Sequence, residues 1–108
     1  MAERYEVVVT SEAEKSLEQI IQYLEEEVSY QTADRVRLAL LQAIEKLEYH
    51  PESNGIVQEI SDDEIRYRRV LVWSYRIIYT IEESVKIVFI LDVDHANRDP
   101  EKLKEDFK

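Results

Sequence analysis

The sequence predicts an α+β fold, in which an N-terminal strand and a helical hairpin pack on a twisted antiparallel sheet. Apolar residues recur at helical spacing through the first half of the chain and at a spacing of two from Ile56 onward. With 44% apolar residues, one glycine and two prolines among 108 residues, the chain is too hydrophobic to be disordered. We therefore expect a single domain that spans residues 1–108.

The N-terminal segment is expected to form a strand and then a helix. Residues 5–10 are rich in β-branched side chains, which is typical of a short strand. Ser11 and Glu14 have the spacing of a capping box, in which a hydroxyl and a carboxylate satisfy free amides at the start of a helix. The apolar residues that follow lie on one helical face: Ala13, Leu17, Ile20, Ile21, Leu24 and Val28.

A second helix is expected to pack antiparallel to the first, because only a short connector separates them. Ser29 to Thr32 provides its cap. Its apolar stripe is formed by five residues: Ala33, Val36, Leu40, Ile44 and Leu47. Leu38 and Leu41 lie beside this stripe, and we interpret them as part of the core rather than as a partner groove. Pro51 cannot continue the helix and begins a turn.

Four strands are expected in the second half of the chain, at residues 56–60, 65–72, 75–81 and 85–93. Trp73 and Ser74 connect the second of these strands to the third. The last two strands are apolar on both faces, so both faces should be covered, one by the helical hairpin and the other by a partner. Asp99 and Pro100 have the pattern of a helix start, which predicts a short C-terminal helix or tail over residues 101–107.

Composition excludes several classes of protein. The formal net charge of −10 repels phosphates, so the chain is not expected to bind DNA directly. The absence of cysteine excludes disulfide scaffolds and cysteine nucleophiles, and it favours a reducing, cytoplasmic location. The longest apolar run, residues 88–91, is far too short to span a membrane. A single glycine leaves no phosphate-binding glycine loop, and no cofactor is expected.

Four arginines and no acidic residue lie within residues 66–76, which makes this segment the main electrostatic anomaly. Along a strand, alternate side chains share a face, so Arg66 and Arg68 should project to one face and Arg69 to the other. If the register allows, Arg69 and Arg76 face each other across the hairpin and could bind phosphate or a carboxylate-rich peptide. In the alternative interpretation, these arginines neutralise the acids of the chain itself.

His95 is the second candidate for chemistry, because it follows the last predicted strand. With Arg98 three residues on, it could act as a general acid or base beside a charge stabiliser. In the alternative interpretation, His95 fixes the loop by a hydrogen bond to the backbone or to Asp99. Asp92 and Asp94 add carboxylates nearby, but the group matches no established ligand spacing, so no metal site is expected.

The order of these elements and three motifs resemble the RelE/ParE superfamily, the toxins of bacterial type II toxin–antitoxin modules, often labelled plasmid stabilization proteins. The first motif is Leu47-x-x-x-Pro51, after the helix pair. The second is Tyr75-Arg76-Ile77-Ile78-Tyr79, and the third is His95-x-x-Arg98-Asp99-Pro100. The resemblance extends from Tyr5 to Leu103 and therefore covers nearly the whole chain.

The resemblance implies a cognate antitoxin, encoded beside the toxin, that wraps its surface. Within the superfamily, RelE-like members cleave mRNA in the ribosomal A site, whereas ParE-like members inhibit DNA gyrase without known catalysis of their own. The residues that match the family pattern are Arg69, Arg76, His95 and Arg98. In a nuclease, His95 would be the general acid or base, and the three arginines would stabilise phosphate charge.

The charge of the chain favours the ParE-like activity, because RelE-like nucleases are typically basic and this chain is at −10. We therefore expect a toxin that binds a protein target such as gyrase and is not itself an enzyme. Two alternatives stay open: a ribosome-dependent endoribonuclease, and a non-toxic, degenerate member that only binds its antitoxin. A homodimer is also left open by the sequence.

Overall fold

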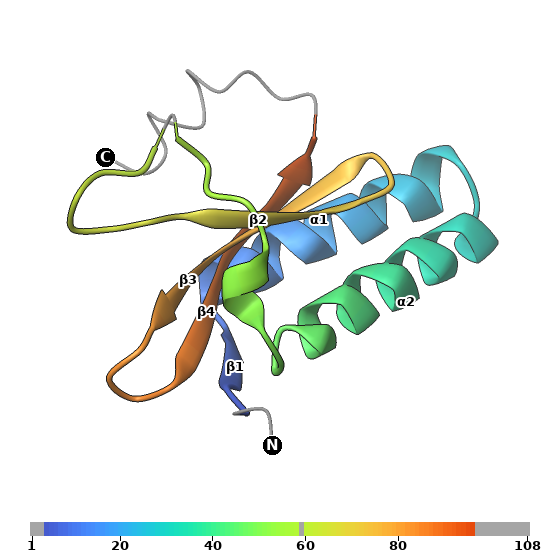
Figure 1. Cartoon of the computed structure of the whole chain (residues 1–108). Helices are drawn as coiled ribbons and strands as arrows, with labels where there is room; N and C mark the ends of the chain where they lie inside the picture. The colour runs from blue at the N-terminus through green and yellow to red at the C-terminus, as the bar shows by residue number, and fades with distance from the viewer. Residues whose placement is uncertain (1–3, 59, 97–108) are drawn as a thin grey trace.

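The computed structural model describes residues 4–58 and 60–96. Two helices, α1 (Ser11–Glu27) and α2 (Tyr30–Lys46), form a hairpin that covers one face of a four-stranded sheet (Figure 1). The α+β fold expected from the sequence is confirmed. The predicted C-terminal helix over residues 101–107 lies outside the described residues. Within those residues, no helix is long and apolar enough to cross a membrane.

The sheet has the strand order β1-β4-β3-β2. Its strands are β1 (Glu6–Val9), β2 (Arg68–Val72), β3 (Tyr75–Glu82) and β4 (Ile87–His95). The three later strands form the expected antiparallel meander, whereas β1 pairs with β4 in parallel and makes the sheet mixed. The parallel pairing arises because α1 follows β1 directly and the long hairpin returns the chain to the other edge of the sheet.

Thr10 joins β1 to α1. Its hydroxyl accepts a hydrogen bond from the Ala13 amide at 3.3 Å and donates one to the Ile90 carbonyl at 2.7 Å. The expectation that Ser11 caps the helix is therefore wrong by one residue, because Ser11 is already the first helical residue. Thr10 is preferred at this position because the end of β1 holds it against β4, where one hydroxyl satisfies groups on both elements.

The hairpin buries the apolar faces of both helices. The Ser29 hydroxyl accepts a hydrogen bond from the Thr32 amide at 3.0 Å, which confirms the predicted cap of α2. Leu38 and Leu41 are 58% and 45% exposed, so the expectation that they belong to the core is wrong. Both point away from the sheet, because Val36 and its neighbours at helical spacing already fill the buried face of α2.

The opposite face of the sheet is covered in part by the chain itself. Val57 packs on Ile78 of β3, with Ile60 and Tyr67 against them. The predicted strand at residues 56–60 is wrong, because the described residues of this segment make a single bridge, between Ile56 and Arg68, and then turn. The predicted strand at residues 65–72 begins only at Arg68, since residues 61–67 form a turn that is closed by the Ser61 and Asp62 side chains.

Tyr79 lies at the centre of the main core, where α2, β3 and the turn after α2 meet. Its ring is fully buried, and its hydroxyl donates a hydrogen bond of 2.5 Å to the Pro51 carbonyl. Pro51 begins a short 3-10 helix, Pro51–Ser53, which is the turn predicted at that proline. Burial raises the pKa of the Tyr79 phenol above its ordinary value, because the charged form would lose its hydration.

The double role of Thr10 gives a matched pair of variants. Thr10→Ala removes the cap of α1 and the bond to Ile90, so it should lower the free energy of unfolding by about 1–2 kcal/mol. Ser11→Ala also removes a hydroxyl group, one residue later in the chain. It should change the free energy of unfolding by less than about 0.5 kcal/mol. Urea denaturation of both proteins measures the difference, and equal losses would contradict the assignment of the cap.

The buried phenol of Tyr79 predicts a loss of stability at high pH. Below pH 10.0, the ordinary pKa of tyrosine, the folded and unfolded chains both keep the proton. Above it the unfolded chain ionises first, so stability falls by about 1.4 kcal/mol for each pH unit and each proton that the fold retains. Urea denaturation at a series of pH values above 10.0 measures how steeply the free energy of unfolding falls with pH. This fall should be shallower for Tyr79→Phe and the same as in the native chain for the exposed control Tyr49→Phe. An identical slope in all three proteins would refute the assignment to Tyr79.

Candidate functional site

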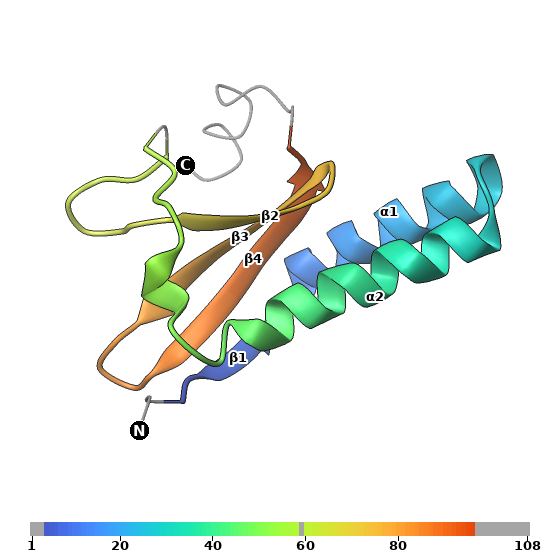
Figure 2. The same cartoon turned by 45° about the vertical axis from the view of Figure 1, so that its right-hand side comes forward.

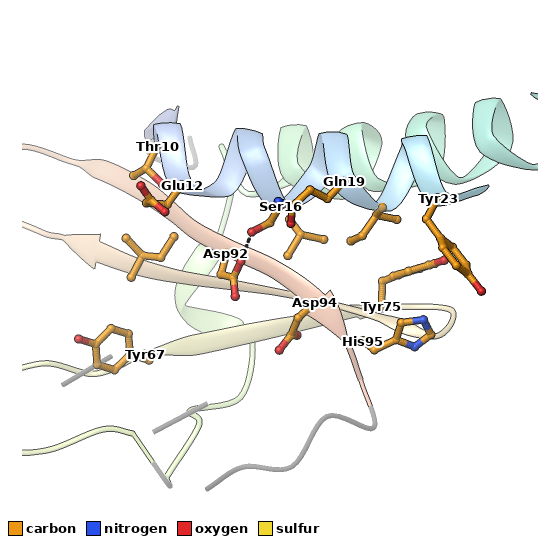
Figure 3. Close-up of a pocket in the computed structure, with 13 residues that line it drawn as sticks. Thr10, Glu12, Ser16, Gln19, Tyr23, Tyr67, Tyr75, Asp92, Asp94 and His95 are labelled. Carbon is orange, nitrogen blue, oxygen red and sulfur yellow. Dashed lines mark hydrogen bonds between the residues drawn. The ribbon is translucent and has the colours of Figure 1, made fainter. Parts of the chain in front are cut away.

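A groove of about 1100 Å³ runs between α1 and the C-terminal half of β4 (Figure 3). It exists because β1 ends at Val9, which pairs with Ile90, while β4 continues to His95. From Leu91 onward, β4 therefore has no neighbouring strand on that side among the described residues. Figure 3 shows Glu12, Ser16, Gln19 and Tyr23 of α1 on one side of the groove and Asp92, Asp94 and His95 of β4 on the other.

The backbone of β4 faces this groove at alternate residues. The Ala96 amide donates to the Ser74 carbonyl at 2.7 Å, which turns Ala96 toward β3. Because backbone groups alternate along an antiparallel ladder, the amides and carbonyls of Val93 and His95 point to the free edge. A free strand edge beside a groove is a site at which an extended peptide can add as a further strand.

Ser16 and Asp92 connect the two walls of the groove. The Ser16 hydroxyl donates a hydrogen bond of 2.6 Å to the Asp92 carboxylate, drawn as a dashed line in Figure 3. The register with β3 shifts here: Ile78 pairs with Asp92 and Tyr79 with Ile90, so Leu91 is an extra residue of β4 and forms a bulge directly before Asp92. Bulges turn side chains away from their regular direction, which accounts for the reach of Asp92 to the helix.

His95 lies at the end of β4, where it is exposed, and its ring packs against Tyr75 with a centroid distance of 5.0 Å and an interplanar angle of 50°. Burial raises the pKa of the Tyr75 phenol, and the nearby Tyr23 adds to the effect. Figure 3 shows Tyr23 and Tyr75 close to His95, so the three rings form an aromatic end to the groove. No described cationic side chain is paired with His95, as a nuclease centre would require.

Arg76 lies on the face of the sheet away from the helices and is buried. Its guanidinium donates two hydrogen bonds to the Asp94 carboxylate, from Nε at 3.0 Å and from an Nη at 2.8 Å. Arg76 and Asp94 are directly opposite each other on β3 and β4, and they are 6% and 8% exposed. The charge of Arg76 is thus neutralised within the chain, which agrees with the second interpretation of the arginine segment for this residue.

Arg69 shares this outer face but does not oppose Arg76. The register pairs Arg69 with Ile78 and Leu71 with Arg76, so the two arginines are diagonal neighbours. The predicted face-to-face pair is therefore wrong, because it required a register two residues away from the observed one. Among the described side chains, Arg69 has no ion-pair partner, and it is half-buried.

Arg68 projects to the opposite face, as the alternation predicted, and donates to the Glu52 and Asn54 carbonyls at 2.9 and 2.7 Å. It therefore fixes the turn after α2 and is not available to a ligand. Arg98, the fourth candidate, and Asp99 lie outside the described residues. Within the described residues, no group of three or more His, Asp or Glu side chains could hold a metal ion.

The three candidate residues that the structure describes thus do not form one site. His95 borders the groove, Arg76 is held by Asp94, and Arg69 lies on the outer face of the sheet. The sequence analysis missed Ser16 and Tyr23, which line the groove, and named Tyr75 only as part of the family motif. Ser16 and Tyr23 are seven residues apart on α1, and this helical spacing is the signal that could have grouped them.

The sequence matches, over residues 7–100, the family described as "ParE toxin of type II toxin-antitoxin system, parDE". No curated protein matches it. Among solved structures, the fold is similar to a chain of a chromosomal ParDE toxin–antitoxin system from Pseudomonas aeruginosa, with a TM-score of 0.68 and 14% identity over 87% of this chain and 98% of that chain.

Two RelE-type structures share the fold as well. A chain of the toxin–antitoxin complex RelBE2 from Mycobacterium tuberculosis has a TM-score of 0.59 and 22% identity, covering 85% of this chain and 98% of that chain. A chain of the archaeal RelE–RelB complex from Pyrococcus horikoshii has a TM-score of 0.57 and 20% identity, covering 89% and 99%. At these identities the likeness shows the fold alone.

The buried pair Arg76–Asp94 predicts strongly non-additive mutations. Asp94→Ala leaves a buried guanidinium without its carboxylate and should cost about 3–5 kcal/mol of unfolding free energy. Replacing both residues by leucine removes both charges and should cost less than Asp94→Ala alone. A double-mutant cycle of Arg76→Leu, Asp94→Leu and the double leucine variant, followed by urea denaturation, measures the coupling, and additive losses would show that the pair does not hold the sheet together.

Proposed function

Because the chain belongs to the ParE family of type II toxins, we propose that it binds and inhibits a protein target such as DNA gyrase and has no catalytic activity of its own. In this proposal a cognate antitoxin, encoded beside it, neutralises the toxin. The cytoplasm, where such a target is found, would be its location, and the module would act in plasmid stabilization.

The ion pair between Arg76 and Asp94 carries the proposal. A ribonuclease of this superfamily would need cationic side chains free to contact the phosphate that is cleaved, since charge stabilisation in the transition state provides much of the rate. Arg76 matches the family pattern on the sheet. Its Nε and one Nη already donate hydrogen bonds to the Asp94 carboxylate, at 3.0 and 2.8 Å. Releasing Arg76 to a phosphate would leave Asp94 buried and charged beside that same anion.

The net charge of −10 adds to this argument, because an acidic surface disfavours approach to mRNA on the ribosome. Association between two proteins has no such requirement. The groove beside β4 supports an antitoxin partner, since its free strand edge and aromatic rim suit an extended apolar segment. Arg69, without an ion-pair partner in the described part of the chain, could receive a carboxylate of that partner.

The proposal is tested by inducible expression in a bacterial host, with and without the adjacent open reading frame. We expect growth arrest with DNA breaks and with intact mRNA 5′ ends, and we expect the neighbouring gene to relieve the arrest. His95→Ala should arrest growth as strongly as the native chain at equal expression, because no chemistry is assigned to this histidine. His50→Ala is the matched control, since the chain has only two histidines and His50 is exposed and lies outside the groove.

Two other outcomes would overturn the proposal, and each would identify a different function. Codon-positioned mRNA cuts that are lost in His95→Ala and kept in His50→Ala would identify a ribosome-dependent endoribonuclease. Normal growth at high expression, together with co-purification of the neighbouring gene product, would identify a non-toxic member that only binds its antitoxin.

A further inference from the structure

The strand β2 forms the edge of the sheet opposite to β1 (Figure 2). Residues 55–57 cover the start of this edge, since the Arg69 amide donates to the Gly55 carbonyl at 3.0 Å. Within the described part of the chain, nothing pairs with the edge after Arg69. Because backbone groups alternate along a strand, the amide and carbonyl of Leu71 point outward from the sheet, as the Arg69 amide does.

This edge lacks the features that keep free strands from pairing. Natural edge strands carry lysine, proline or a bulge, or are covered by another segment. Residues 70–74 are Val, Leu, Val, Trp and Ser, with neither charge nor proline, and the register of β2 with β3 is regular. Leu71 and Trp73 are 56% and 66% exposed. A regular, uncharged and apolar edge of this kind favours pairing with a further strand.

Trp73 has a backbone conformation that does not suit a large side chain. It connects β2 to β3 with a φ of 53°, in the left-handed region where glycine is preferred and a bulky residue is strained. Its ring is mostly exposed, so packing within the chain does little to offset this strain. Tryptophan is enriched among the residues that contribute most to protein interfaces. Trp73 therefore has the position and the chemistry of a contact residue.

A groove of about 520 Å³ lies between β2 and α2 along this edge. Tyr49, Leu71 and Trp73 line it, and each of them is half exposed or more. None of the residues that line the groove is Asp or Glu, although 24 of the 108 residues of the chain are acidic. Two chains with a net charge of −10 repel each other where carboxylates meet. At this groove they can approach without bringing the carboxylates of the two chains together.

We propose that β2 pairs with β2 of a second copy of this chain, antiparallel across a two-fold axis at Val72. Gly55 decides the position of the axis, because it blocks further strand pairing at Arg69 and leaves only the rest of the edge free. An axis at Val72 places Leu71 of each copy opposite Trp73 of the other, so that each exposed apolar side chain meets another. The same surface serves both copies, as a two-fold interface requires, and the two sheets become continuous.

The contact lies at the opposite edge of the sheet from the groove beside β4. It leaves that groove open to an antitoxin, and it can hold or fail independently of the proposed toxin activity. A strand pair of this length buries less area than a standard protein interface, so we expect a dissociation constant in the micromolar range.

The test is sedimentation velocity of the full chain from about 5 to 500 μM, together with tryptophan fluorescence. Trp73 is the only tryptophan, so its emission reports on the proposed interface alone. We expect the sedimentation coefficient to rise with concentration and the emission maximum to shift to shorter wavelength over the same range, as the ring leaves water. Raising the salt concentration should strengthen association, because salt screens the repulsion between two acidic chains.

Two leucines of nearly equal exposure give a matched pair of variants. Leu71→Lys puts a charge on the free edge and should weaken association about tenfold or more. Leu38→Lys adds the same charge to α2 outside the groove, where the native leucine is 58% exposed. This control should change the dissociation constant by less than about twofold.

Trp73→Gly separates the contact from the stability of the fold. Glycine adopts a φ of 53° without strain, so this variant should unfold at the same urea concentration as the native chain or at a higher one. It should also weaken association about tenfold or more, because the ring that meets Leu71 of the other copy is lost. A purely structural tryptophan would give the opposite result, with lower stability and unchanged association.

Several results would overturn the proposal. A chain that stays monomeric up to about 500 μM, or a dimer that survives in both Leu71→Lys and Trp73→Gly, would reject the site. Equal weakening by Leu71→Lys and Leu38→Lys would show an effect of charge alone, and association that weakens as salt is raised would place the contact on charged surfaces. If the chain alone is monomeric and the product of the neighbouring gene shields Trp73 from acrylamide quenching, the edge belongs to the antitoxin instead.

Discussion

The structure depends on a central strand that has no exposed face. Five consecutive residues of β3, from Tyr75 to Tyr79, are buried. Because alternate side chains point to opposite faces, the helical hairpin can cover only Ile77 and its neighbours at alternate positions. The other face must be closed by different means, and the chain uses two. Val57 covers Ile78, and Asp94 neutralises Arg76.

The way in which the second face is closed limits what the sheet can bind. An arginine buried opposite an aspartate contributes structure, since its charge and two of its N–H donors are used. The arginine-rich segment therefore offers a smaller cationic surface than its composition indicates, with Arg68 fixing a turn and Arg76 fixing a strand pair. Backbone groups and apolar side chains are exposed instead at the edges of the sheet and on the hairpin.

The length of β1 determines one of these edges. Thr10 ends the strand because its hydroxyl caps α1, and the chain then leaves the sheet to begin the helix. The strand β4 extends five residues beyond its last pairing with β1, at Ile90, and ends at His95. A single capping residue thus creates the free edge and brings the polar face of α1 beside it. The groove is a consequence of this junction.

The sequence predicts features that depend on neighbouring residues, such as helix caps and helical periodicity. It does not predict contacts that depend on the register between strands. Ser29 and the helical periodicity around it specify α2 without reference to the rest of the chain, and both were predicted correctly. Arg76 and Asp94 are 18 residues apart, and only the observed register places one opposite the other. The choice of Thr10 over Ser11 was also non-local, because the carbonyl that favours Thr10 belongs to Ile90.

Exposure could not be predicted for side chains beside an apolar stripe. Leu41 differs from Leu40 only by its angle around α2, and a stripe of either width is compatible with the sequence pattern. The width of the buried face is decided by how far the hairpin lies over the sheet, which depends on tertiary packing. The far end of the hairpin, where α1 ends and α2 begins, projects past the strands (Figure 2), and Val28 and Tyr30 there are 59% and 72% exposed.

The net charge of the chain does not describe how charge is distributed on the sheet or on the helical hairpin. On the sheet, an aspartate and an arginine cancel inside the protein, and they add nothing to the field that a ligand meets. On the hairpin, carboxylates at residues 25–27 are exposed or half-buried without ion pairs in the described structure, at the helix end where they are least favourable. An isolated helix would be weakened by such a turn. The hairpin tolerates it because Ala13, Ile21 and Leu24 anchor α1 to the core, so packing offsets the electrostatic cost of these carboxylates.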